Sequence, residues 1–368
     1  MLGLGIYGGW RWGFVPALAC LLLAEFALCF SPRPAWRRLA LSLLGLTLPL
    51  AGLEVVARVW HVPPDKGRIV HSVAYTEPHS LLGYAGRPSV AAEVARVLPD
   101  GREAFRVTYR LDGDGWRKSA KQTPRANQTV LCFGGSFMFG EGLEDSQTLP
   151  SRLEAESGGT WHTRNLAMPG YGGHQMLAIL EAGLEKPGPD EPPVKRAYYI
   201  ATLPPHAERA AGKAFWDLRG PRYRIRGQEL VNTGPFHSAR AARLLKFCET
   251  SQAYVRFLSP ASRPCTRPQL ETYLAIVKRS RTLLAERYGV ELCVILWAWN
   301  DDLPFYTELF EGAHLNFVAI NDIIPDYSQN LRHYHIPIDA HPNEVAYREL
   351  GHFLATKEAP EPGGKARP

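Results

Sequence analysis

Two apolar runs of membrane-spanning length stand near the amino end of this 368-residue chain, at 14–30 and 39–56. Only Glu25 and Glu54 place a charge within them. Runs of this length predict transmembrane helices. Two consecutive runs joined by a tight basic turn favour a helical hairpin over two buried core helices. We therefore expect residues 1–60 to hold two transmembrane helices, with membrane contact through 14–56.

The basic residues around these runs predict their orientation. The connecting turn carries Arg33, Arg37 and Arg38, and an excess of positive charge indicates the cytoplasmic side. Both chain ends then face away from the cytoplasm. Other basic residues oppose this orientation: Arg11, Arg58, Lys66 and Arg68. Trp10, Trp12 and Trp60 suit membrane interfaces, and the first run lacks the basic start and cleavage site of a removed signal peptide.

Residues 61–127 have the pattern of short strands and turns. The stretch FRVTYRLDGDGWR alternates apolar and polar residues and then reaches an Asp-Gly-Asp-Gly turn. Alternation with period two predicts half-buried β-strands. This part is expected to be a small β-rich segment that links the anchor to the main domain.

From residue 128 the pattern changes to strands that alternate with helices. Apolar stretches such as QTVLCFGG, VKRAYYIAT and VELCVILWAW predict strands, and LPSRLEAES, GGHQMLAILEAGLEK and NEVAYRELGHFLAT predict helices. Such alternation predicts a mostly parallel sheet with helices on both faces. Residues 128–357 should form this domain, with a Pro-, Gly- and Arg-rich insertion at about 203–267. The insertion is either a substrate-binding element or a tolerated surface excursion, and residues 358–368 should be a disordered tail.

Charge and cysteine usage identify neither a polyanionic partner nor a cofactor. The net charge is +6, but Lys and Arg are scattered, and no nucleic-acid-binding motif is present. Six cysteines occur without a Cys-x-x-Cys pair, so the sequence supports neither a metal site nor a thioredoxin-type site. We expect no nucleic-acid partner, no metal and no cofactor. Cys248 and Cys265 are either a disulfide of an oxidising compartment or two free thiols.

A serine near the first core strand and an acid-histidine pair near the end could form one catalytic site. Ser136 follows FGG at the carboxyl end of that strand, the edge where α/β sheets bind ligands. Asp339 and His341 stand two apart before the last helix, as the base and orienting acid that a serine nucleophile needs. Each signal alone has a plain alternative. The Gly-Gly-Ser turn could bind phosphate or reverse the chain, and Asp-Ala-His could cap a helix beside a solvated histidine.

In order, these motifs resemble those of the SGNH/GDSL hydrolase family. Residues 134–140 (GGSFMFG) resemble the first block, with Gly135 where aspartate is commonest; residues 165–172 (NLAMPGYG) resemble the second, and 339–343 (DAHPN) the last. The resemblance spans about 128–356. It implies a flavodoxin-like, three-layer α/β sandwich, a Ser136-His341-Asp339 triad, and an oxyanion hole that includes the backbone N–H groups of Ser136 and Gly170.

The third block departs from the family pattern. Members usually place an Asn side chain after the third strand as a further oxyanion donor, whereas this chain has YIATLPPH at 199–206. Thr202 or His206 could substitute, or the site could keep only its backbone donors. Losing one donor typically lowers the rate about a hundredfold or more. A non-catalytic protein therefore stands as an alternative.

The resemblance implies a serine esterase that acts on acyl esters, chiefly O-acetyl esters, of an envelope glycan or lipid. The alternatives are a polysaccharide O-acyltransferase with the same triad and a non-catalytic glycan-binding or scaffolding module. The expected location is the cytoplasmic (inner) membrane, multi-pass, with the catalytic domain facing the periplasm or cell exterior. In the insertion, aromatic and basic side chains could bind sugars and anionic groups, or form a basic solvated face: Trp216, Arg222, Tyr223, Arg224 and Arg226.

Overall fold

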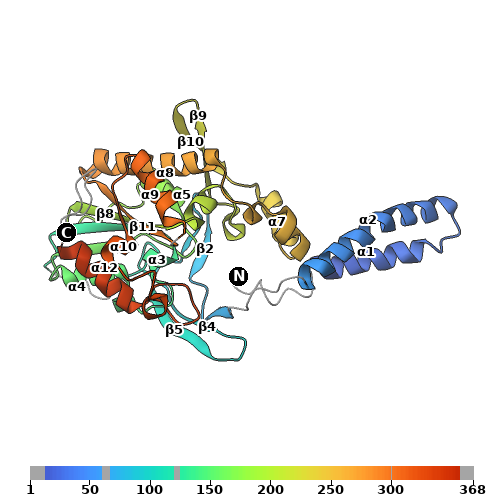
Figure 1. The fold of residues 1–368 in the computed structure, drawn as a ribbon, viewed down its shortest axis with the longest axis horizontal. Helices are drawn as coiled ribbons and strands as arrows, with labels where there is room; N and C mark the ends of the chain where they lie inside the picture. Colours follow the sequence, from blue (N-terminus) through green and yellow to red (C-terminus); the bar gives the residue numbers. More distant parts are fainter. Residues whose placement is uncertain (1–12, 60–66, 120–124, 300, 357–368) are drawn as a thin grey trace. The chain divides into compact units, whose positions relative to one another are not determined.

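The computed structural model describes residues 13–59, 67–119, 125–299 and 301–356 (Figure 1). The chain divides into two compact units. Unit 1 comprises Met1–Asp65 and His237–Pro264, and unit 2 comprises Lys66–Phe236 and Cys265–Pro368. The predictions for Trp10, Trp12, Trp60 and the 358–368 tail lie outside the described residues.

Unit 1 contains two antiparallel helices, α1 (Phe14–Leu28) and α2 (Pro34–Val59). Thr47 of α2 donates a buried hydrogen bond of 2.6 Å to one oxygen of the Glu25 carboxylate of α1, so a polar contact joins the two helices within the apolar pair. Among the described helices, α2 alone is long and apolar enough to cross a membrane, whereas the 15 residues of α1 make a shorter apolar helix.

The second part of unit 1 comes from the middle of the chain. It contains helix α7 (Ala239–Cys248), a π-helical turn η4 (Tyr254–Leu258) and a 3-10 turn η5 (Pro260–Ser262). Ser238 caps α7, because its side chain accepts a hydrogen bond from the Ala241 N–H. The expected insertion at about 203–267 is thus shared between the two units.

Unit 2 is built on a five-stranded sheet in the order β12-β11-β8-β6-β7. Its strands all pair in parallel. They span the following residues: β6 Gln128–Phe133, β7 Trp161–Asn165, β8 Val194–Leu203, β11 Leu292–Ala298 and β12 Phe317–Ala319. The predicted α/β class with a parallel sheet is confirmed.

Helices cover both faces of this sheet, as Figure 1 shows. One layer contains α4 (Leu149–Glu156) and α12 (Glu344–Thr356), and the other contains α5 (Gly173–Ala182) and α8 (Arg267–Tyr288). Short helices complete the unit: α3 Ser136–Phe139, α6 Pro205–Ala210, α9 Leu303–Gly312, α10 Ile320–Ile323 and α11 Leu331–Tyr334. Strands β8 and β11 are buried along nearly their whole length, as a covered parallel sheet requires.

The β-rich part that precedes the sheet belongs to unit 2. An antiparallel sheet has the order β1-β4-β5, and β2 and β3 form a hairpin. The strands are β1 Arg68–His71, β2 Thr76–His79, β3 Gly83–Gly86, β4 Ala91–Val97 and β5 Glu103–Arg110. Alternate residues of β5 are buried in the common core, which matches its alternating sequence.

The insertion contributes a second hairpin to unit 2. It is formed by β9 (Pro221–Arg226) and β10 (Glu229–Pro235), and β9 packs on α5 and α8. Cys248 and Cys265 are free thiols and belong to different units.

Candidate active site

Ser136 lies at the turn from the first core strand into a short helix. Strand β6 ends at Phe133, two glycines follow, and Ser136 opens α3 with 9% of its surface exposed. A β-carbon at position 135 would lie 2.8 Å from Arg209 Nη1 and from the Tyr171 carbonyl oxygen, and 2.9 Å from His206 Nε2. These contacts are too close for any side chain, so the approach of these groups to the turn requires glycine at this position.

Asp339 and His341 lie in the loop before α12. The His341 ring Nδ1 is hydrogen-bonded to Asp339 Oδ1, and the same oxygen accepts the His341 backbone N–H at 3.0 Å. Asn343 caps α12 by accepting from the Val345 and Ala346 N–H groups, at 2.9 and 3.2 Å. Ile338 has a φ of 66°, which a β-branched residue adopts only under strain. The loop is thus held on both sides of the acid-histidine pair.

Two further charged residues complete this cluster. Arg96 of β4 brings its Nε to 2.6 Å from Asp339 Oδ2, and its Nη2 lies 3.8 Å from Glu141 Oε1. The other Glu141 oxygen lies 3.7 Å from His341 Nε2. Asp339 is almost fully buried, and the other three side chains are 15–18% exposed. The imidazole therefore lies between two carboxylates, one at each ring nitrogen.

These contacts shift the pKa of both members of the pair. Burial by itself would raise the pKa of Asp339, but the hydrogen bond from His341 and the positive charges of His341 and Arg96 lower it to about 2. Burial by itself would lower the pKa of His341. The charge of Glu141 and the hydrogen bond and charge of Asp339 outweigh burial, so the pKa is raised. Both shifts favour the ionised pair.

The residue after Ser136 contacts both His341 and the helix that follows it. The Phe137 ring, directly after Ser136, lies against the His341 ring with centroids 5.4 Å apart. Tyr347 of α12 donates a 2.5 Å hydrogen bond to the Phe137 carbonyl, which joins the helix after His341 to the helix that begins at Ser136. Among the described residues the Ser136 hydroxyl has no hydrogen-bond partner, so it makes no hydrogen bond to His341.

The second motif supplies a glycine in the left-handed backbone region, packed closely by aromatic side chains. Gly170 has a φ of 86°, and a β-carbon there would lie 2.5 Å from Trp216 Nε1 and 2.7 Å from the Tyr84 hydroxyl. Trp216 donates to the Gly170 carbonyl at 3.2 Å. In the described part of the chain, the backbone N–H groups of Ser136 and Gly170 have no acceptor. Both groups are available to an oxyanion.

The two third-block residues that could replace the missing asparagine are both buried. Thr202 is buried near the end of β8. The His206 ring is fully buried; its Nδ1 bonds the Tyr199 hydroxyl at 2.8 Å, and its Nε2 has no partner among the described residues and lies close to Gly135. Burial, with the neighbouring charges of Arg209 and His174, holds the pKa of His206 well below its usual value, so the ring is neutral.

The predicted substrate-binding residues of the insertion occupy different environments. Trp216 is 42% exposed beside Gly170, with the Arg209 guanidinium 5.6 Å from its ring. Tyr223 is buried in β9, where its hydroxyl donates to Glu181 at 2.6 Å. Arg222 contacts Thr233 on the partner strand, while Arg224 and Arg226 are exposed on the hairpin. Trp216 alone among these contacts a residue of the predicted triad or oxyanion hole.

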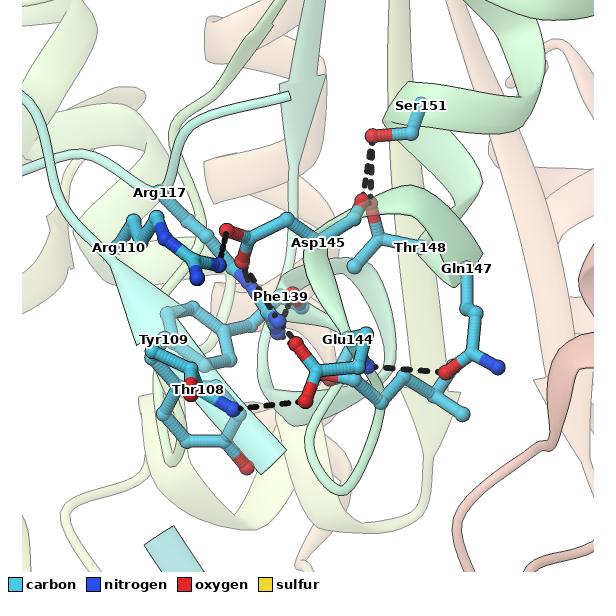
Figure 2. A network of polar contacts seen from close by, with 12 residues as sticks. Thr108, Tyr109, Arg110, Arg117, Phe139, Glu144, Asp145, Gln147, Thr148 and Ser151 are labelled. Atoms are coloured by element: carbon cyan, nitrogen blue, oxygen red, sulfur yellow. Dashed lines mark hydrogen bonds and ion pairs between the residues drawn. The ribbon is translucent and has the colours of Figure 1, made fainter. Parts of the chain in front are cut away.

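A buried arginine supports the segment after Ser136, as Figure 2 shows. Arg117 donates to the carbonyl oxygens of Phe139, Gly140 and Leu143 at 2.6–2.9 Å and contacts Asp145 at 3.1 Å. Its guanidinium carbon lies 4.4 Å from the Tyr109 ring centroid. Glu141 lies between these carbonyl groups in the chain, so Arg117 also fixes the backbone around Glu141.

Sequence reasoning missed four residues of this region: Arg96, Glu141, Arg117 and Arg209. Glu141 alone had a local signal, because it stands five residues after Ser136, directly after the first motif. The described residues contain no group of three or more His, Cys, Asp or Glu side chains that could hold a metal ion.

The fold of this chain is similar to that of several solved structures. No family model and no curated protein matches the chain. A member of the lipolytic protein G-D-S-L family from Veillonella parvula matches with 11% identity and a TM-score of 0.36, covering 62% of this chain and 97% of that one. Est24, a carbohydrate acetylesterase from Sinorhizobium meliloti, matches with 13% identity and a TM-score of 0.34, covering 62% and 96%. At TM-scores below 0.5 these likenesses say nothing about substrate or mechanism.

Proposed function

We propose that the protein is a membrane-anchored serine esterase of the SGNH/GDSL type, acting on acyl esters, chiefly O-acetyl esters, of an envelope glycan or lipid. The observation that carries the proposal is the partly buried Asp339-His341 hydrogen bond, with the imidazole packed on the residue that follows Ser136. Paired in this way, an acid fixes the tautomer of a histidine that acts as a base.

In the proposed reaction the Ser136 hydroxyl attacks the ester carbonyl while His341 Nε2 takes its proton. Asp339 holds Nδ1–H and stabilises the imidazolium that results. The backbone N–H groups of Ser136 and Gly170 bind the oxyanion, and His341 then gives its proton to the leaving alcohol. Water, activated by His341, releases the acid and restores the serine. This step requires a hydrogen bond between the Ser136 hydroxyl and His341 Nε2 in the complex with substrate.

The anchor in this proposal is the α1-α2 pair. Helix α2 has the length and apolarity of a membrane span, and many of its large apolar side chains are exposed, such as Leu41, Leu46 and Leu48. Arg33 lies in the turn between the helices and Arg37 in the first turn of α2, which favours a cytoplasmic location for this end of the pair and a catalytic unit outside the cytoplasm.

Trp216 is our proposed substrate platform. Its exposed indole lies beside Gly170, so a sugar that carries the ester could stack there while the carbonyl reaches the oxyanion hole. The buried Tyr223 would then support the hairpin from beneath, and Arg224 would lie on its solvent side.

Hydrolysis of p-nitrophenyl acetate by the full chain in nanodiscs tests the proposal. Ser136→Ala and His341→Ala should each lower the rate about a thousandfold or more. Ser80→Ala and His352→Ala, at exposed positions, are the matched controls and should leave it unchanged. A wild-type chain that neither hydrolyses the ester nor reacts with a serine-directed phosphonate would refute catalysis and favour the binding module. Acetyl transfer to an added glycan in preference to water would favour the acyltransferase.

A further inference from the structure

Residues 237–264 pack on the end of the anchor hairpin that is remote from its connecting turn (Figure 1). The Glu54 carboxylate of α2 is nearly fully buried there and accepts three hydrogen bonds from this segment. They come from the Ser251 hydroxyl at 2.7 Å, the Ala253 N–H at 3.0 Å and the Gln252 N–H at 3.1 Å. A buried carboxylate with this many donors fixes the segment firmly to α2.

Both helices of the hairpin contribute to this attachment. The Phe14 N–H at the start of α1 donates to the Thr250 hydroxyl at 2.8 Å, and the Phe14 and Phe247 rings lie 6.1 Å apart. Arg58 bridges Glu54 at 2.8 Å and the Thr250 carbonyl at 3.3 Å. The segment is therefore part of the anchor unit, although nearly 200 residues separate it from α2.

Helix geometry places this attachment at a membrane boundary. Pro34 and Glu54 are 20 residues apart in α2, which at 1.5 Å per residue is about 30 Å. This length is about the thickness of the hydrocarbon core of a bilayer. If the arginine-containing turn lies at one boundary, Glu54 and the segment bound to it lie at the other.

The outward side chains of the segment are those of an interfacial element. Its exposed large apolar residues are Leu244, Phe247, Phe257 and Leu258, with exposed fractions of 37–64%. Helix α7 adds three exposed basic residues at three-residue spacing: Arg240, Arg243 and Lys246. The segment carries five Lys or Arg residues and a single acidic one, Glu249. Apolar and basic side chains combined on a short helix are typical of helices that lie in the plane of a membrane surface.

We propose that residues 237–264 are a membrane-interface element that binds anionic lipid. Helix α7 and the turn Tyr254–Leu258 would insert the four apolar side chains at the headgroup boundary, while Arg240, Arg243 and Lys246 contact lipid phosphates. This proposal rests on the proposed membrane anchoring, because the segment is attached to α2 through Glu54.

Site-specific fluorescence of the full chain in nanodiscs tests it. Accessible native cysteines (Cys20, Cys29, Cys248 and Cys265) are replaced with alanine, and single cysteines at Leu244, Leu258, Leu46 or Arg102 carry an NBD label. Labels at 244 and 258 should be blue-shifted and quenched by lipids with a nitroxide near the headgroup. The label at 46 should be quenched by nitroxides deep in the acyl chains, and that at 102, on an exposed arginine of unit 2, by neither.

The outcomes separate this proposal from the anchoring on which it rests. Quenching at 46 with water-like emission at 244 and 258 would refute the interface element and leave the anchor intact. Water-like emission at all of these positions would refute the anchor and the element together.

Lipid charge gives a second test. Replacing Arg240, Arg243 and Lys246 with glutamine should abolish the extra quenching at 244 that phosphatidylglycerol gives over phosphatidylcholine. Glutamine at Arg224, Arg226 and Arg267, which are exposed on unit 2, is the matched control and should preserve it. Equal quenching in both lipids for the wild-type chain would overturn the role assigned to the basic residues.

Discussion

Glu141 Oε2 lies 3.7 Å from His341 Nε2, the ring nitrogen that would accept the proton of a catalytic serine. Asp339 holds the other ring nitrogen, so the imidazole lies between two carboxylates that both favour its charged form. A histidine acts as a base only when neutral. Glu141 therefore sets the pH at which the proposed triad begins to work.

Glu141→Gln should move the acidic limb of the pH-rate profile to lower pH. Removing the negative charge lowers the raised pKa of His341, so the neutral base becomes available in more acidic solution. A carboxylate 3.7 Å from the imidazole is close enough to shift the acidic limb measurably. The kcat/KM for p-nitrophenyl acetate, measured from pH 4 to 9, reports the shift.

Glu93→Gln is the control for this measurement, because Glu93 is exposed on β4 and pairs with Arg106 away from the imidazole. It should leave the profile unchanged. An acidic limb that stays in place in Glu141→Gln would show that Glu141 does not act on His341.

Arg96→Gln should weaken the fold above about pH 4 and raise the midpoint of acid unfolding. The pKa of Asp339 is lowered from 3.8 to about 2 in the folded state. The ionised carboxylate therefore stabilises the fold above about pH 3.8, and this stabilisation is lost as the pH falls toward 2. The full shift corresponds to about 2 kcal/mol of unfolding free energy, and Arg96 supplies a part of it. Urea denaturation of the full chain at several pH values, followed by tryptophan fluorescence, measures the loss.

Arg102→Gln serves as the comparison, since Arg102 and its partner Asp100 are both largely exposed. The Arg102→Gln variant should keep a urea midpoint close to that of the wild-type chain at every pH, because solvent screens this exposed pair. If Arg96→Gln behaved in the same way, the contact between Arg96 and Asp339 would have no energetic role.

Arg117→Met should cost about 3–5 kcal/mol of unfolding free energy, because it leaves Asp145 and several carbonyl oxygens buried without their donor. Arg110→Gln removes the other, largely exposed contact to Asp145 and should cost about 1 kcal/mol or less. The two urea midpoints give the comparison directly. Equal costs would mean that the network drawn in Figure 2 does not depend on the buried arginine.

Local sequence patterns were enough to propose the candidate residues that lie close together in the chain. Ser136 follows a strand, and Asp339 and His341 share one loop, so short motifs are enough to find them. The parallel sheet was also predicted, because buried strands and amphipathic helices alternate clearly. Strand β12 was not, since three residues at Phe317–Ala319 carry too little periodicity.

Other parts of the site depend on contacts that no local pattern records. Arg96 lies on an antiparallel strand more than 200 residues before Asp339. In the sequence, nothing distinguishes it from a charged residue on the exposed face of a strand. The basic spacing of α7 was visible in the sequence, but the contact of Glu54 with Ser251 was not. Both residue pairs form only when tertiary packing brings distant segments of the chain together.

Gly135→Ala should lower esterase activity far more than it lowers stability. A β-carbon at this position would lie 2.8 Å from the Tyr171 backbone oxygen, which cannot move aside as a flexible side chain would. The turn must therefore shift, and with it the Ser136 hydroxyl and the neighbouring N–H groups. A displacement of about 1 Å in a catalytic group typically costs about a hundredfold in rate.

Gly113→Ala is the matched control, because a β-carbon there meets nothing within 4 Å. It should retain wild-type kcat/KM for p-nitrophenyl acetate and a wild-type urea midpoint. Full activity in Gly135→Ala would show that the turn has room to relax around Arg209 and His206. In that case the close approach of those two side chains would not require glycine at position 135. The position would then tolerate aspartate, the commonest residue there in the SGNH/GDSL hydrolases.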